Sequence, residues 1–368
     1  MGWLILDLSG SPFFLGLNTF CFAVPMAVVS PFGGVVADRL SRTRVLIVSQ
    51  STLFVFTAIL AALVFLELAT VWHLMTASLL IGTMMAFNVP ARQALVPVLV
   101  GRELVANAVA MHSMGLNTSR IIGPALAGFL INAVGAAGCF LLQSLGYLWS
   151  VGNVTAIKIN QQMKSEQRRS QLHDLLEGLR YCWRTGPVLT MLIMATISSV
   201  FVMPIYMTLL PAYARETLGQ DASGLGLLMS AASVGALSGS VALAMAGRLP
   251  ARGLIVLCGV AGAGALLIVA STIRTMAPAM LVLGGLTTCS AVVMILNQSI
   301  IQETVPNELL GRVMSVYLVT WGLMPLGAIP LAAVADSFGT PSAFAIGGAI
   351  SVVLALTMLV LRSDVRQI

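Results

Sequence analysis

The feature that most constrains this chain is a series of apolar runs, each about twenty residues long, separated by short polar loops. Hydrophobic residues make up 58% of the 368 residues and charged residues only 9%, whereas a soluble domain carries about 25% charged residues. Runs of this length cross a bilayer as helices, because a helix satisfies its own backbone hydrogen bonds. The runs do not alternate with a period of two, which disfavours a β-barrel. We therefore expect an all-α polytopic membrane protein.

The apolar runs predict eleven complete transmembrane helices. They lie near 13–36, 45–66, 73–96, 106–132, 138–158, 187–213, 223–247, 253–272, 277–302, 308–335 and 340–361. A short apolar stub, Gly2 to Leu8, precedes them. As a helix it would reach only about 10 Å, against about 30 Å for the hydrocarbon core.

The basic residues predict the orientation. Of the 19 Lys and Arg residues, all but Arg120, Arg215 and Arg274 fall in one set of alternating loops. Cytoplasmic loops carry such an excess of positive charge. We therefore place these loops and Ile368 in the cytoplasm, and the start of the chain near the outer face. The lipid bilayer thus explains the net charge of +6 without nucleic acid as a partner.

Similar segments recur in the two halves of the chain in the same order. Leu15 to Leu17 matches Leu225 to Leu227, and Arg92 to Leu104 resembles Asn297 to Leu309 at a similar separation. This predicts two parallel repeats. We expect an N-terminal helical bundle over 1–159, a cytoplasmic linker over 160–186 and a C-terminal helical bundle over 187–368. In a design of six plus six helices, most of the first helix would precede Met1, so the chain either starts upstream or is a shortened product.

The loop after the first complete span carries a recognisable motif. Residues 34–46 resemble the signature loop of the major facilitator superfamily, G-x-x-x-D-R-x-G-R-R-x-x-L, with matches at Gly34, Asp38, Arg39, Arg42 and Leu46 and departures at Ser41 and Thr43. The resemblance implies the major facilitator fold and a cytoplasmic conformational latch made by Gly34, Asp38, Arg39, Arg42 and Arg92. The alternative is a simple positively charged inner loop. The second-half copy keeps Arg248 but has Gly247 in place of the acid, so we expect a one-sided latch.

The span 106–132 carries a second motif. Gly123, Pro124 and Gly128 resemble the G-x-x-x-G-P-x-x-G-G motif of drug:proton antiporters in the same superfamily. The small residues would allow close helix packing and the proline would bend the helix. The alternative is a generic kinked helix. Arg120 lies about halfway along this span, where a charge costs at least about 2.5–3.5 kcal/mol. It either recognises a substrate or is bonded to backbone carbonyls.

The superfamily resemblance also implies a central path lined by helices 1, 4, 7 and 10. Twenty methionines suit an adaptable apolar pocket, although any single one is as well explained as core packing. On these helices the predicted path residues are Met85, Asn88, Tyr206, Met207, Asn297 and Gln298.

None of the acidic residues lies deep within an expected span. All thirteen acids lie in loops or near the expected helix ends, although proton-coupled carriers usually need a buried titrating group. Asp7 is the nearest candidate for such a group, but a helix-end role explains it better. The five cysteines form no CxxC pair, so we expect no metal site and no cofactor.

The polar stretch between the halves contains an amphipathic pattern. Apolar residues recur there at helical spacing, at Leu172, Leu175, Leu176, Leu179, Cys182 and Trp183. We expect a linker helix on the inner membrane face, with the binding of a regulatory partner as the weaker alternative.

Residues 6–12, 88–94 and 305–313 look like the branch of the superfamily that contains the enterobactin exporter and the macrolide efflux pumps. The resemblance implies a secondary transporter of the bacterial inner membrane, not an enzyme. It would export a siderophore, drug or macrolide-like molecule by alternating access with protons as the coupling ion. Two alternatives remain open, a truncated non-transporting remnant and a lipid flippase of the same fold.

Overall fold

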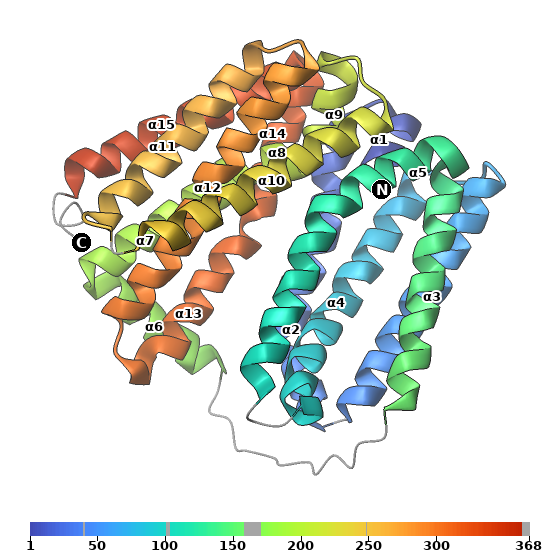
Figure 1. Cartoon of the computed structure of the whole chain (residues 1–368), viewed down its shortest axis with the longest axis horizontal. Coiled ribbons are helices and arrows are strands. Elements are labelled where there is room, and N and C mark those ends of the chain that lie inside the picture. Colours follow the sequence, from blue (N-terminus) through green and yellow to red (C-terminus); the bar gives the residue numbers. More distant parts are fainter. Residues whose placement is uncertain (40, 101–103, 158–170, 248, 363–368) are drawn as a thin grey trace. The chain divides into compact units, whose positions relative to one another are not determined.

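The computed structural model describes residues 1–39, 41–100, 104–157, 171–247 and 249–362, and it contains helices but no strand within them (Figure 1). This confirms the all-α fold class. The described residues form two compact units, one of residues 1–10 and 17–168 and the other of residues 11–16 and 169–368.

The helices of the first unit follow the apolar runs closely. They are α1 (Gly2–Ser9), α2 (Phe13–Arg39), α3 (Arg42–Phe65), α4 (Val71–Val100) and α5 (Val105–Ala156). The long helix α5 contains two expected spans, because Gly135 interrupts it with a φ of 72°. Glycine adopts this left-handed region without the steric penalty of a side chain. The helix therefore turns back where the sequence predicts a short loop.

The second unit begins with the linker helix and continues through six spans. Its elements are α6 (Gln171–Arg184), α7 (Gly186–Ile197), η2 (Ser198–Val202), α8 (Met203–Thr208), α9 (Leu210–Ala212), η3 (Tyr213–Thr217), α10 (Ala222–Ala246), α11 (Arg252–Thr272), α12 (Met276–Thr304), α13 (Asn307–Gly322), α14 (Met324–Phe338) and α15 (Thr340–Leu361). The elements η2 and η3 are single π-helical turns: η2 lies within the span that the sequence predicts over 187–213, and η3 begins at the last residue of that span.

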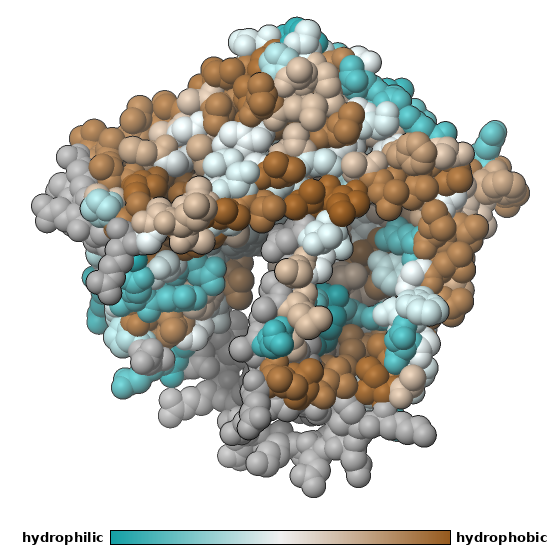
Figure 2. Space-filling model, viewed as in Figure 1, coloured by the Kyte–Doolittle hydropathy of each residue, from teal (hydrophilic) through white to brown (hydrophobic). Residues whose placement is uncertain are grey.

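Nine stretches of the described chain are long and apolar enough to cross a membrane. One of them, Met114–Ala156, is the stretch that Gly135 divides, and Phe13–Val29 is a further, shorter apolar helix. The described spans therefore agree with the sequence prediction. In Figure 2, hydrophobic residues cover broad areas of the visible face of each unit, as lipid contact requires.

The two repeats place equivalent helices in the same order. α2 and α10 precede the inner loops, α3 and α11 follow them, and α4 and α12 come next. Both α3 and α11 begin with an arginine, Arg42 and Arg252. At the end of α10, Gly247 has a φ of 62° and closes the helix. The parallel repeat expected from the sequence is confirmed.

Glycines bring helix backbones into close contact in the second unit. A Cβ atom added at Gly235 of α10 would overlap the carbonyl oxygen of Gly284 on α12. A Cβ at Gly264 of α11 would lie 2.7 Å from the carbonyl oxygen of Gly348 on α15. Helices in membranes associate through such small residues, because lipid offers no hydrophobic drive. These crossings hold α10 against α12 and α11 against α15.

Candidate functional site

The signature loop of the first half joins α2 to α3. Gly34, Asp38 and Arg39 lie in the last turns of α2, and their side chains are outside the described part of the structure. Arg42 opens α3 and is half-buried, and Arg92 is exposed on α4. The latch assigned to these residues stays a prediction.

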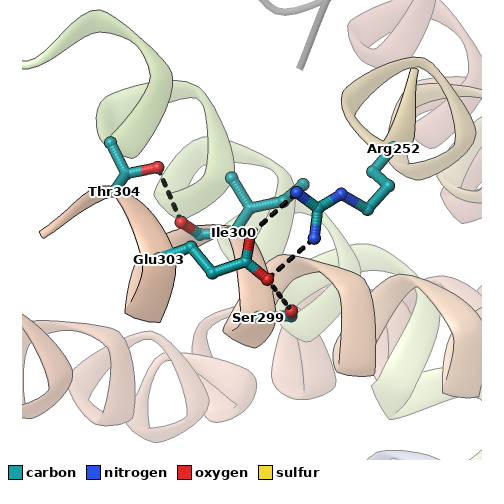
Figure 3. A network of polar contacts seen from close by, with 5 residues as sticks. All are labelled: Arg252, Ser299, Ile300, Glu303 and Thr304. Atoms are coloured by element: carbon teal, nitrogen blue, oxygen red, sulfur yellow. Dashed lines mark hydrogen bonds and ion pairs between the residues drawn. The ribbon is translucent and has the colours of Figure 1, made fainter. Parts of the chain in front are cut away.

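The corresponding region of the second half contains a defined polar cluster (Figure 3). The guanidinium group of Arg252 donates from Nη1 to Oε1 of Glu303 over 2.8 Å and from Nη2 to Oε2 over 2.7 Å. The hydroxyl of Ser299 donates to the same Oε1 over 2.9 Å. A two-pronged pair of this kind fixes geometry better than a single contact. It joins the first turn of α11 to the last turn of α12.

The helix dipoles do not explain this ion pair. Arg252 is at the N-terminus of α11, which carries partial positive charge, and Glu303 is near the C-terminus of α12, which carries partial negative charge. Each charge is therefore at the end that disfavours it, at a cost of about 0.3–1 kcal/mol. The two charges stabilise each other, and removing either one leaves the other in an unfavourable position.

This cluster does not test the predicted one-sided latch, because both of its charged residues belong to the second unit. Gly247 indeed stands where the first half has Asp38, but the second half supplies its acid from α12 as Glu303. Sequence reasoning classed Glu303 as one more helix-end acid. Arg252 begins α11 and Glu303 lies 51 positions later at the end of α12, so no local sequence pattern identifies the pair.

A second ion pair attaches the linker helix to α13. Arg312 Nη1 donates to Glu177 Oε1 over 2.6 Å. Beside it, a Cβ added at Gly178 would lie 2.7 Å from the Arg312 carbonyl oxygen, so the two helices touch through their backbones. Cys182, one turn further on, is fully buried in the core of the unit. A helix forms where the leucine spacing predicts one, and one of its faces is docked.

The asparagines predicted to line the path are buried and hydrogen-bonded within their own bundles. Asn88 is 3% exposed and donates from Nδ2 to the Ser49 hydroxyl on α3 over 3.0 Å. Asn297 is 1% exposed and donates from Nδ2 to the Met191 carbonyl oxygen on α7 over 2.9 Å. Within the described chain, Asn297 Oδ1 is buried without a hydrogen-bond partner. These bonds tie helices together, and a role in the path stays a prediction.

The other predicted path residues differ in exposure. Met85, Tyr206 and Gln298 are partly buried, and Met207 on α8 is 53% exposed. The side chain of Arg120 is outside the described part of the structure, so its choice between substrate recognition and packing stays open.

The motif around Pro124 lies within continuous helix in the structure. Residues Gly123, Pro124 and Gly128 all lie within α5, and the helix has its only non-helical backbone at Gly135 among the described residues. No described atom lies within 4 Å of a Cβ built at Gly123, although Gly128 is buried. The close approach expected at Gly123 is thus not seen in the described unit.

The chemistry available in the described chain is that of hydrogen bonds and ion pairs. No group of three or more His, Cys, Asp or Glu side chains that could hold a metal ion occurs among the described residues. The five cysteines are free thiols.

Comparison with known proteins identifies the class of this fold. The model of the family described as transmembrane secretion effectors matches residues 1–368. A solved structure of a peptide transporter POT superposes with a TM-score of 0.76 at 14% identity, covering 96% of this chain and 86% of that one. The chain belongs to the transmembrane secretion effectors, and it is a multi-pass plasma-membrane transporter of the major facilitator superfamily.

Curated relatives carry the names of exporters and siderophore transporters. The chain is 27% identical to the staphyloferrin A transporter of Staphylococcus aureus, over 95% of this chain and 87% of the relative. It is 25% identical to the multidrug efflux pump Tap of Mycolicibacterium fortuitum, over 93% and 85%. The enterobactin exporter EntS of Salmonella paratyphi A is 24% identical over 81% and 71%. The branch expected from residues 6–12, 88–94 and 305–313 is therefore confirmed.

Proposed function

We propose that this transporter exports a small molecule, a siderophore or a drug, by alternating access. The observation that carries the proposal is the match of the whole chain to the secretion effectors. Relatives named for staphyloferrin A, for multidrug efflux and for enterobactin point to the same substrate range. Membership of the superfamily makes the protein a carrier and not an enzyme.

Two parallel bundles, of which the second has ion pairs at one end, suit alternating access. In the second bundle, the Arg252–Glu303 and Arg312–Glu177 pairs hold helix ends together by contacts that are partly exposed. Such pairs are worth about 0–1 kcal/mol each. Contacts of this size keep a bundle end ordered and can still be exchanged during a transport cycle.

Protons are the coupling ion that we propose, on the resemblance of the Gly123-Pro124 motif to drug:proton antiporters. Among the described residues, no carboxylate side chain is buried. The proton carrier is therefore to be sought at a helix end, where Asp7 of α1 and Asp38 of α2 lie.

The deciding experiment is export from proteoliposomes with an imposed proton gradient. Purified protein should move staphyloferrin A or erythromycin against its concentration gradient, and a protonophore should stop the movement. Transport that a protonophore leaves unchanged would contradict proton coupling, and the absence of transport for every siderophore and drug tested would favour the remnant. Movement of labelled lysophospholipid alone would favour the flippase.

Arg120 provides the test of the path. If it binds substrate, Arg120→Lys should keep folded yield but lose most transport, because lysine lacks the planar five-donor fork of arginine. Arg274→Lys, at an exposed arginine bonded to Ser271 and Ile273 carbonyls, is the matched control. Normal transport per folded molecule in Arg120→Lys and Arg120→Ala would assign Arg120 to packing.

A further inference from the structure

The linker helix α6 has one docked face and one free face. The docked face is fixed by Gly178 against the Arg312 backbone, by the Glu177–Arg312 pair and by the buried Cys182. These contacts set the rotation of α6 about its own axis. They therefore also determine which side chains point away from the unit.

The free face is apolar. Leu176 is 64% exposed, Leu179 41% and Trp183 70%. These residues are three and four positions apart, so they form one stripe along the helix. The sequence predicts one apolar face for α6, but the structure divides that set, because Cys182 enters the core while Leu176, Leu179 and Trp183 stay exposed.

Two arginines border this stripe. Arg180 and Arg184 are exposed and lie one position after Leu179 and Trp183. At 3.6 residues per turn, this spacing places both arginines on the same side of the stripe. The free surface of α6 thus has an apolar strip with a basic edge, and the acid Glu177 is engaged by Arg312.

The position of α6 in the chain puts this surface at the membrane boundary. α6 ends at Arg184, and the apolar span that includes α7 begins at Gly186. The arginine distribution places this end of the span on the cytoplasmic side. Figure 2 shows hydrophilic residues gathered on the second unit near α6.

We propose that the free face of α6 binds anionic phospholipid of the inner leaflet. Leu176, Leu179 and Trp183 enter the interface between headgroups and acyl chains, and Arg180 and Arg184 bind the headgroup phosphates. Tryptophan prefers this depth, and basic side chains beside an apolar stripe select anionic lipids. The charge of the edge is what favours a lipid surface over an apolar protein partner. This inference does not depend on which molecule is transported.

Quenching of Trp183 by brominated lipid tests the proposal. The purified full chain is placed in nanodiscs of phosphatidylcholine and phosphatidylglycerol in equal parts, with bromine on the acyl chains of one lipid or of the other. The signal of Trp183 is the difference between wild type and Trp183→Phe. Bromine on phosphatidylglycerol should quench it more strongly, with each arginine contributing an about fivefold preference for the anionic lipid.

Matched variants separate charge from folding. Arg180→Gln and Arg184→Gln should each reduce the preference, and the double variant should abolish it while the apolar quenching remains. Arg362→Gln removes a charge at the predicted cytoplasmic end of α15 and should leave the preference intact. Gel filtration verifies that each variant is folded. A Trp183 signal that neither lipid quenches, or equal quenching by both lipids in the wild type, would overturn the proposal.

Discussion

The two halves of this transporter repeat the same helices but obtain their inner-end charges differently. In the first half the acid Asp38 ends α2 and lies next to Arg39 in the sequence, with Arg42 opening α3. In the second half Gly247 occupies the place of the acid, and Arg252 pairs instead with Glu303 of α12. One acid is local to its loop, and the other comes from a different helix.

The two halves share their helix positions but not their charged contacts. Helix positions are held by backbone packing, which tolerates little change. Charged contacts at exposed helix ends contribute little free energy, so several arrangements are equally acceptable to the fold. The helices therefore follow the repeat closely while the charged partner moves from one helix to another.

Packing also distinguishes regions of the two units. In the second unit, glycines at the α10–α12 and α11–α15 crossings admit no side chain. In the first unit, Gly123 of α5 has open space around it among the described atoms, although Gly82 of α4 is close to the Phe22 backbone of α2. The contrast can be tested with one substitution made at two sites.

The largest effect is expected from Gly235→Ala. The added methyl group would meet the Gly284 carbonyl oxygen and the Thr287 side chain, and overpacking against backbone costs about 1–3 kcal/mol or more. Folded yield and thermal stability in detergent should fall clearly. Gly123→Ala is the matched control, and it should keep or slightly raise stability because alanine favours helix by about 1 kcal/mol. Equal behaviour of the two variants would refute the packing contrast.

The next effect concerns transport rather than folding. Asp38→Asn should reduce export severalfold while membrane insertion stays normal. A severalfold reduction is what a shift of about 1 kcal/mol in the conformational equilibrium of the latch would produce. Asp336→Asn is the control. It removes an exposed acid near the C-terminal end of α14, outside the signature loop, and should leave export unchanged. Normal efflux by Asp38→Asn at normal expression would show that the motif no longer acts as a latch.

Sequence patterns predict features that many residues determine together. Hydrophobicity summed over about twenty residues places each span, and the glycine at 135 marks the turn inside α5. Pairs of single residues escape such reasoning. The Arg252–Glu303 contact spans 51 positions and the Asn297–Met191 contact 106, and no local pattern encodes which helix faces which. The signature loop could be recognised because all of its residues are consecutive.

A smaller effect is expected from breaking the interhelical pair of the second half. Glu303→Gln should lower stability by about 0.5–1 kcal/mol, because it leaves Arg252 alone at the unfavourable end of α11. The double variant Arg252→Gln, Glu303→Gln should cost less than the sum of the single variants, as coupled residues do. Thermal unfolding of all four forms gives the coupling energy. Strict additivity of the two single changes would mean that the contact is energetically silent.

The sharpest comparison, with the smallest net effect expected at Asn297, involves Asn88 and Asn297. Asn88→Ala removes a bond to Ser49 and should cost about 1 kcal/mol. Ser49 keeps its own bond to the Leu46 carbonyl oxygen, so no donor is stranded. Asn297→Ala removes one bond to Met191 but also a buried oxygen that has no partner in the described chain. The two changes oppose each other, so its stability should change by less than that of Asn88→Ala.

Transport then separates packing from the path. If both asparagines only tie helices together, export per folded molecule should match wild type in both variants. A loss of export in Asn297→Ala at unchanged stability would instead place its free carbonyl oxygen in the path, where an unpartnered acceptor is available to a substrate donor. On that outcome, Asn297 Oδ1 would lower the stability of the fold and yet be required for transport.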